Sequence, residues 1–187
     1  MLFETIKIKD GKIFNLKWHN QRFNKAQKEL FHTSTLSNLA AYITPPKKGL
    51  YRCKIIYDKS IQSIEYFPYK ARNFQNFQVL QSDLDYHLKY CDRSELEKLL
   101  KNHDEIIIEK EGLLTDTSIA NIAFYDGVSW LTPAAPLLEG TTRARLIDKG
   151  FLKLANIEKE NLKDYSHFAL MNAMIGFCIQ KSVKIQT

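Results

Sequence analysis

Apolar and polar positions alternate along the first residues of the chain, which is the period of a β-strand. Residues 3, 5 and 7 form one set, and residues 4, 6 and 8 form the other. The pair Asp10-Gly11 follows, a strong turn signal, and a second short run extends from Lys12 to Leu16. We therefore expect a β-hairpin over residues 2–16.

The period changes after this hairpin. From about His19 to Phe31, apolar side chains recur at the spacing of one helix face, which predicts a helix. Two β-rich runs follow at residues 50–57 and 61–69, separated by the expected turn Asp58-Lys59-Ser60. Together these elements predict a small α+β lobe.

The second half of the chain predicts a larger lobe built mainly of strands. Residues 70–77 are polar and weakly patterned, as in a connection, and a strand begins at Val79. Ser94 and Glu97 have the spacing of a capping box, which predicts a helix over residues 95–101. Further strands are expected at 105–109, 121–125, 128–131, 152–157, 168–171 and 177–185, and a helix between Gly140 and Gly150. The expected fold class is α/β (α+β), with one lobe over residues 1–75 and a second over 76–187.

Composition and charge narrow the class of protein. The 187 residues are 44% hydrophobic and 12% aromatic, which suits a globular protein rather than a disordered one. No apolar run resembles a signal peptide or a membrane span, so a cytoplasmic location is expected. The net charge is +6, from 21 Lys and six Arg against 21 acidic residues, without a dense basic block. We interpret this as a lysine-rich surface rather than a nucleic-acid interface.

Three cysteines, an odd number, suit reduced thiols and have no metal-ligand spacing, so no metal is expected. Cys91 lies two residues after Lys89 and invites comparison with a nucleophile. No base is identifiable beside it, and we interpret it as a small packing residue.

Three motifs carry candidate chemistry. They are a lysine in YHLKYCDR (Lys89), an acid in LTDTSIAN (Asp116) and a glycine-led turn in LLEGTTRARL (Gly140, Thr141, Thr142). A pyridoxal phosphate site needs an amine for a Schiff base, an acid for the pyridine nitrogen and a phosphate cradle at a helix start. Each motif alone has a simpler interpretation: a strand lysine in water, a turn cap, and an ordinary helix start.

In motif and order, LKYCDR, TDTSIANIAFYDG, WLTPAAPLLEGTTR and LMNAMIG resemble the class IV aminotransferase family, fold type IV of the pyridoxal phosphate enzymes. The resemblance resumes at FETIKIKDGKIFNLKWHNQRF and is weak between residues 34 and 80. It implies a two-lobed fold with a shortened first lobe, a barrel-like second lobe, the cofactor pyridoxal 5'-phosphate and a homodimer.

The resemblance also implies roles for individual residues. Lys89 would form the Schiff base, and its apolar neighbours Leu88 and Tyr90 would favour the neutral amine. Asp116 stands where the family usually carries glutamate, one methylene longer, so its reach to the pyridine nitrogen differs. The Gly140, Thr141 and Thr142 turn would cradle the phosphate.

Two further residues come from the N-terminal match. A histidine followed three residues later by an arginine opens the first helix in the family, and His19 and Arg22 fit that pattern. Arg22 would then contact the cofactor phosphate, whereas spacing alone would favour a surface arginine. Thr5 matches a threonine that the family's lyases associate with elimination, although a threonine in a strand is ordinary.

The implied activity is elimination of pyruvate from 4-amino-4-deoxychorismate, an anionic amine, to give 4-aminobenzoate. An aminotransferase acting on a branched-chain or D-amino acid starts with the same steps and stays open as an alternative. A catalytically silent cofactor-binding protein is a second alternative. Arg52, in the expected strand 50–57, could meet a substrate carboxylate or could be an exposed strand cation.

Overall fold

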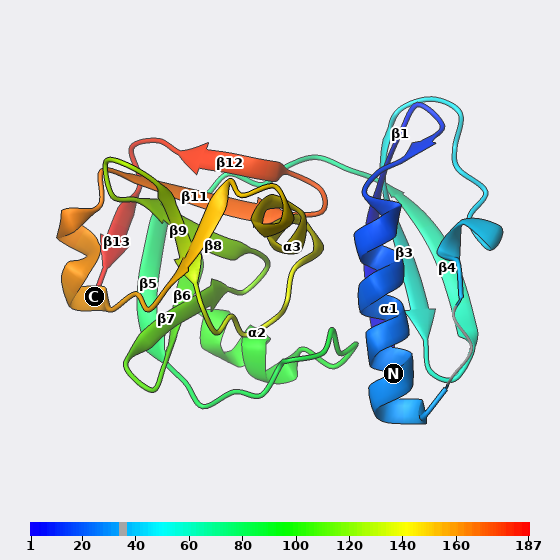
Figure 1. The fold of residues 1–187 in the computed structure, drawn as a ribbon, viewed down its shortest axis with the longest axis horizontal. Helices are drawn as coiled ribbons and strands as arrows, with labels where there is room; N and C mark the ends of the chain where they lie inside the picture. The colour runs from blue at the N-terminus through cyan, green and yellow to red at the C-terminus, as the bar shows by residue number, and fades with distance from the viewer. Residues whose placement is uncertain (34–36) are drawn as a thin grey trace. The chain divides into compact units, whose positions relative to one another are not determined.

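The computed structural model describes residues 1–33 and 37–187, which divide into two compact units (Figure 1). The first unit comprises residues 1–71 together with Leu88–Asp92, and the second comprises 72–87 and 93–187. The expected boundary near residue 75 placed Lys89 in the second lobe. In the structure, the segment that carries Lys89 folds with the first unit.

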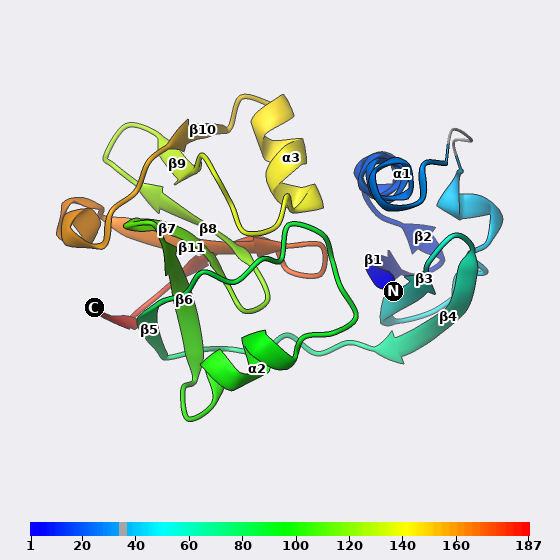
Figure 2. The same cartoon turned by 90° about the horizontal axis from the view of Figure 1, so that it is seen from below.

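The first unit is a four-stranded antiparallel sheet with one long helix. The strands are β1 (Leu2–Lys9), β2 (Lys12–Ile13), β3 (Leu50–Tyr57) and β4 (Ile61–Pro68), in the order β2-β1-β3-β4. The helix α1 (Leu16–Phe31) runs along one face of this sheet, and Figure 2 shows it end-on. A short 3-10 helix, η1 (Leu39–Ala41), follows it.

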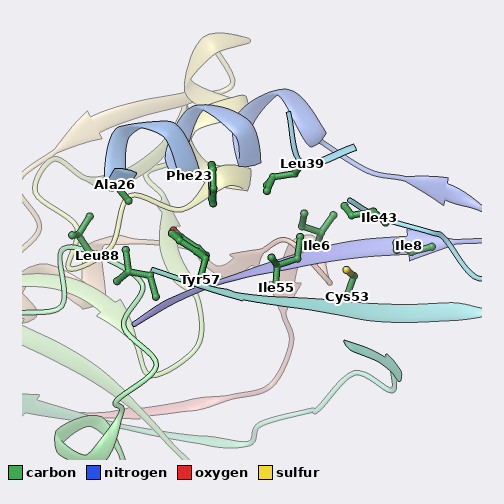
Figure 3. Packing of buried hydrophobic residues seen from close by; sticks show 11 residues of the cluster. Ile6, Ile8, Phe23, Ala26, Leu39, Ile43, Cys53, Ile55, Tyr57 and Leu88 are labelled. Carbon is green, nitrogen blue, oxygen red and sulfur yellow. The ribbon is translucent and has the colours of Figure 1, made fainter. Parts of the chain in front are cut away.

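The core of the first unit lies between α1 and the sheet. β1 contributes Leu2, Ile6 and Ile8, β3 contributes Cys53, Ile55 and Tyr57, and α1 contributes Phe23 and Ala26 (Figure 3). These side chains alternate along each strand, so every second residue of β1 and β3 points to the opposite face. We call the face that packs on α1 the inner face and its opposite the outer face.

Residues 88–91 are held against the free edge of β1. The backbone N–H of Phe3 donates to the carbonyl of Lys89 over 2.9 Å, and that of Cys91 donates to Met1 over 3.1 Å. Leu88 is buried in the core of the first unit. The position of Lys89 is therefore fixed by main-chain bonds to β1 on one side and by apolar packing on the other.

The second unit is a large mixed sheet. Its main strand order is β10-β9-β8-β7-β6-β5-β13, while β11 pairs with both β8 and β12. The strands are β5 (Asn76–Gln81), β6 (Glu105–Lys110), β7 (Leu113–Thr117), β8 (Asn121–Tyr125), β9 (Trp130–Pro133), β10 (Leu152–Ala155), β11 (His167–Asn172), β12 (Gly176–Gln180) and β13 (Lys184–Gln186).

Two helices and a 3-10 turn complete this unit. They are α2 (Ser94–Leu100), α3 (Thr141–Asp148) and η2 (Lys159–Asp164). The loop after β9 leads into α3, which then leads into β10 (Figure 2). Stacked and edge-on rings of Phe77, Phe124 and Phe168 form the centre of the core. Among the described residues, no helix is long and apolar enough to cross a membrane.

Several expected boundaries differ from the structure. The second strand of the hairpin ends at Ile13, and α1 begins at Leu16, because Asn15 adopts a left-handed conformation that turns the chain into the helix. The strand β7, which carries Asp116, was missing from the expected order. The expected strand 177–185 is two strands, since Ser182 has a φ of 55° between them.

Candidate active site

The Lys89 side chain lies over an aromatic ring of β1. Its Nζ atom is 4.5 Å from the centroid of the Phe3 ring, and Phe3 is on the outer face. An ammonium group is attracted to the face of such a ring. The main-chain bonds described above fix the base of the side chain, while the ring holds its tip.

Thr5 lies on the same face, two residues along β1 from Phe3. In the antiparallel register Thr5 faces Lys54 of β3. The structure thus brings Lys89 and Thr5, the two residues expected to be catalytic, to one face of one sheet.

Arg22 contacts a residue that the motifs did not single out. Its Nε donates to Oε1 of Glu4 over 2.8 Å, and its NH2 donates to Oε2 over 2.6 Å, a bidentate pair. His19 Nδ1 is 2.7 Å from the same Oε2, and because a carboxylate only accepts, this nitrogen carries the hydrogen. Glu4 and His19 are fully buried, on the inner face side of β1.

Burial and neighbouring charges determine the protonation of the cluster formed by Glu4, His19 and Arg22. Burial opposes ionisation of Glu4, but the Arg22 guanidinium and the His19 hydrogen bond outweigh it and lower the Glu4 pKa to about 2. Burial lowers the pKa of His19. Its Nε2 is buried without a hydrogen-bond partner among the described residues. At neutral pH the cluster is a Glu4 carboxylate, an Arg22 cation and a neutral imidazole.

Asp116 is buried in the second unit and held by two donors. Asn121 Nδ2 donates to Oδ1 over 2.7 Å, and the backbone N–H of Leu138 donates to Oδ2 over 2.8 Å. Burial nevertheless dominates and raises the pKa of the carboxyl to about 7. A cation brought next to this carboxyl would favour its ionised form.

The helix α3 begins where the motif placed a phosphate cradle. Gly140 is its N-cap residue, with a φ of −71°, and no side chain caps the helix. Thr142 Oγ1 is buried and lacks a hydrogen-bond partner among the described residues. The first backbone N–H groups of a helix have no partner within it, so this end presents donors and one orphaned hydroxyl.

Asn121 links the carboxyl to the cradle. Its Nδ2 also donates to the carbonyl of Leu138 over 2.7 Å. A Cβ atom added at Gly140 would lie 1.8 Å from Asn121 Oδ1, so only glycine permits this approach. The glycine is therefore required by close packing and not by its backbone conformation.

The structure thus groups the expected residues in two sets. Lys89, Thr5 and Arg22 belong to the first unit, with Arg22 on the side of β1 that also carries Glu4, while Asp116 and the α3 turn belong to the second. Sequence reasoning missed Glu4 and Asn121. A charged residue within the apolar set of β1 was the available signal for Glu4, and Asn121 stands in the TDTSIAN motif itself.

Comparison with known proteins defines the class. Residues 87–183 match the family Amino-transferase class IV. An uncharacterised protein of Haemophilus influenzae is 38% identical over 184 residues, 94% of this chain and 98% of that protein. The chain therefore belongs to the class IV aminotransferase family and is an enzyme of that class.

Solved structures show the same fold. A chain from Haemophilus somnus 129pt, described as a "putative 4-amino-4-deoxychorismate lyase", is 37% identical with a TM-score of 0.84, covering 94% of this chain and 96% of that chain. A hypothetical aminotransferase from Mycobacterium tuberculosis in its PLP-bound form is 16% identical with a TM-score of 0.75, covering 97% and 80%. At that identity the second comparison supports the fold alone, which is fold type IV.

Proposed function

We propose that this chain is a pyridoxal phosphate-dependent lyase that converts 4-amino-4-deoxychorismate into 4-aminobenzoate and pyruvate. The observation that carries the choice within the family is the 37% identity, over nearly both full lengths, to the Haemophilus somnus chain described as such a lyase. Thr5 on the same face as Lys89 is consistent with it, because the lyase resemblance singles out this threonine.

The residues present fit the cofactor. In the second unit, the Thr142 hydroxyl without a hydrogen-bond partner and the uncapped start of α3 suit a phosphate. In the first unit, Arg22 is a cation fixed by Glu4, and its chemistry also suits a phosphate. Asp116 is a buried carboxyl that a protonated pyridine ring would stabilise in its charged form. Lys89 supplies the amine that would bind the aldehyde. When bound, the cofactor supplies an electron sink for the carbon that loses its proton.

The chain's own residues account for the proton transfers. The Lys89 amine takes the proton from the carbon that bears the substrate amine, as a general base. The bond between the ring and the enolpyruvyl oxygen breaks, the ring becomes aromatic, and the proton returns to the departing enolpyruvyl group. The products, 4-aminobenzoate and pyruvate, together contain all the atoms of the substrate. We assign to the Thr5 hydroxyl the role of orienting the departing group.

The test is a direct product assay on the cofactor-loaded protein. One reaction contains 4-amino-4-deoxychorismate, and a second contains a branched-chain or D-amino acid with 2-oxoglutarate. We expect 4-aminobenzoate and pyruvate in equal amounts in the first and no glutamate in the second. Glutamate in the second without 4-aminobenzoate in the first would reassign the protein as an aminotransferase.

Two variants connect the assay to the site. Borohydride treatment followed by peptide mapping should place the reduced cofactor on Lys89, and a label on another lysine would refute its role. Thr5→Ala should lower the rate of elimination while leaving cofactor binding unchanged. Lys59→Met is the control variant. Lys59 lies in the exposed turn between β3 and β4 and has no role in the proposed reaction, so this variant should behave like wild type.

A further inference from the structure

The outer face of the first sheet is unusually cationic. The alternation of β1 and β3 places Lys7, Arg52 and Lys54 on this face, and the Lys89 ammonium joins them over Phe3. The outward residues of β4 contribute one acid, Glu65. Cations outnumber acids on the face that holds Lys89 and Thr5, which indicates a preference for anionic ligands.

Lys54 contacts the same aromatic ring as Lys89. Its Nζ lies 5.5 Å from the centroid of the Phe3 ring, the same ring that lies 4.5 Å from Lys89 Nζ. The two distances limit the separation of the two nitrogens to about 10 Å. Lys54 also faces Thr5 across the strand pair, so its Cβ is a direct neighbour of that threonine's Cβ.

The Lys54 ammonium has no polar partner in the described part of the chain. Within residues 1–33 and 37–187, it makes no hydrogen bond or ion pair, and it contacts the Phe3 ring. Glu65 faces Lys54 in the register of β3 and β4 but is exposed and forms no ion pair with it. The Lys54 ammonium is therefore able to pair with an anionic group of a ligand at this face.

We infer that Lys54 binds a substrate carboxylate and selects amines whose carboxylate is remote from the reacting carbon. This inference rests on the proposed function, because it assumes that the reacting carbon of the substrate lies at Lys89. The carboxylate of an α-amino acid is attached to the reacting carbon itself. In 4-amino-4-deoxychorismate both carboxylates lie several bonds away, so a second cation set apart from Lys89 suits that substrate class. Lys54 is thereby a specificity-determining residue.

The experiment measures binding separately from turnover. The probe is chorismate, which carries both carboxylates and a hydroxyl in place of the reacting amine, titrated calorimetrically into the cofactor-loaded protein. Lys54→Met should weaken chorismate binding at least tenfold, whereas Lys54→Arg should stay within threefold of wild type because it keeps the charge. Lys59→Met is the matched control and should bind like wild type. Cofactor absorbance and melting temperature should be unchanged in all three variants.

Turnover gives a second readout. Lys54→Met should raise KM for 4-amino-4-deoxychorismate about tenfold while kcat changes less than threefold. Chorismate affinity in Lys54→Met within twofold of wild type, or no chorismate binding by wild type, would overturn the inference. Failure of the proposed function has a different signature, since wild type would then release no 4-aminobenzoate whatever its affinity for chorismate.

Discussion

Glu4 is a single carboxylate that holds two side chains of α1, and this determines how Arg22 can be used. The bidentate contact fixes the plane of the guanidinium, and the bond from His19 fixes the second oxygen of Glu4. Removing Arg22 altogether would leave a buried carboxylate without its cation, which costs about 3 kcal/mol or more. In Arg22→Ala, a direct loss of cofactor binding therefore could not be distinguished from a loss of protein stability.

Arg22→Lys separates these effects. Lysine keeps a positive charge beside the buried Glu4 carboxylate, so we expect a smaller loss of melting temperature than in Arg22→Ala, although lysine lacks the planar fork. Affinity for pyridoxal phosphate should fall about tenfold, roughly 1.4 kcal/mol, since one directed contact is lost. Absorbance titration of the cofactor measures the affinity. Lys28→Met, on an exposed position of the same helix, is the control. Unchanged affinity in Arg22→Lys would assign Arg22 to structure alone.

The Asp116 carboxyl makes stability depend on pH. Its pKa is about 7 in the folded chain and 3.8 as an ordinary aspartate, so between these values the folded state holds a proton that the unfolded state has lost. The free energy of unfolding therefore falls as pH rises through this window and is constant above it. Between pH 5 and 7, the contribution of Asp116 amounts to about 2 to 3 kcal/mol, from about 1.4 kcal/mol per unit.

Asp116→Asn removes that dependence. As pH rises from about 5 to about 8, the unfolding free energy of wild type should fall by this amount relative to that of the variant. The variant lacks the carboxyl that loses its proton in this range. Urea unfolding of the cofactor-free proteins at both pH values measures it. The exposed Asp83→Asn variant controls for the general loss of a carboxylate. A constant difference across the pH range would show that Asp116 is ionised at pH 5.

The residue scale also shows where sequence reasoning stopped. Lys89 and Asp116 were predicted as site residues from local motifs, each within a few residues. Glu4 was assigned to the same strand set as Ile6 and Ile8, but its partners lie 15 and 18 residues away on a helix. Pairing between a strand and a helix depends on how they pack, and no spacing in the sequence encodes that.

At the scale of elements, the start of α3 is held by the Asn121 side chain. Gly140→Ala would place a methyl group 1.8 Å from Asn121 Oδ1, so either the helix start or the amide must move. We expect a loss of stability of about 1 to 3 kcal/mol, the usual cost of overpacking. The φ of −71° at Gly140 suits alanine, so backbone strain does not contribute. Chemical denaturation of the single variant measures the loss.

A double-mutant cycle identifies the cause. In an Asn121→Ala background the amide is gone, and Gly140→Ala should then cost much less than in wild type. Equal costs in the two backgrounds would mean that the helix start is strained by something other than Asn121.

Elements with a strong period were predicted well, and those with a mixed pattern were not. β3 agrees with the expected residues 50–57, and β8 with 121–125. β7 was missed because its sequence LLTDT is largely buried but polar at three of five positions. Thr115 bonds to Ile108 of β6, Thr117 to Ala120 in the turn before β8, and Asp116 to Asn121. Buried polar side chains with such partners leave no alternation to detect.

At the scale of the whole molecule, charge affects how anions reach the site. The chain carries a net charge of +6, and several cations, among them Lys54 and Lys89, lie on the outer face of the first sheet. A dianionic substrate is attracted by such a field, and dissolved salt screens the attraction. Raising ionic strength from about 10 mM to about 100 mM shortens the Debye length from about 30 Å to about 10 Å.

We therefore expect kcat/KM for 4-amino-4-deoxychorismate to fall roughly fivefold over this range, mainly through KM, while kcat stays nearly constant. Steady-state assays at several concentrations of sodium chloride measure the slope, and sucrose of equal osmolarity controls for effects other than screening. Lys54→Met should show a shallower slope than wild type, because it removes one of the charges nearest the proposed site, whereas Lys59→Met should keep the wild-type slope. A kcat/KM independent of salt would mean that the positive charge serves solubility and does not contribute to substrate binding.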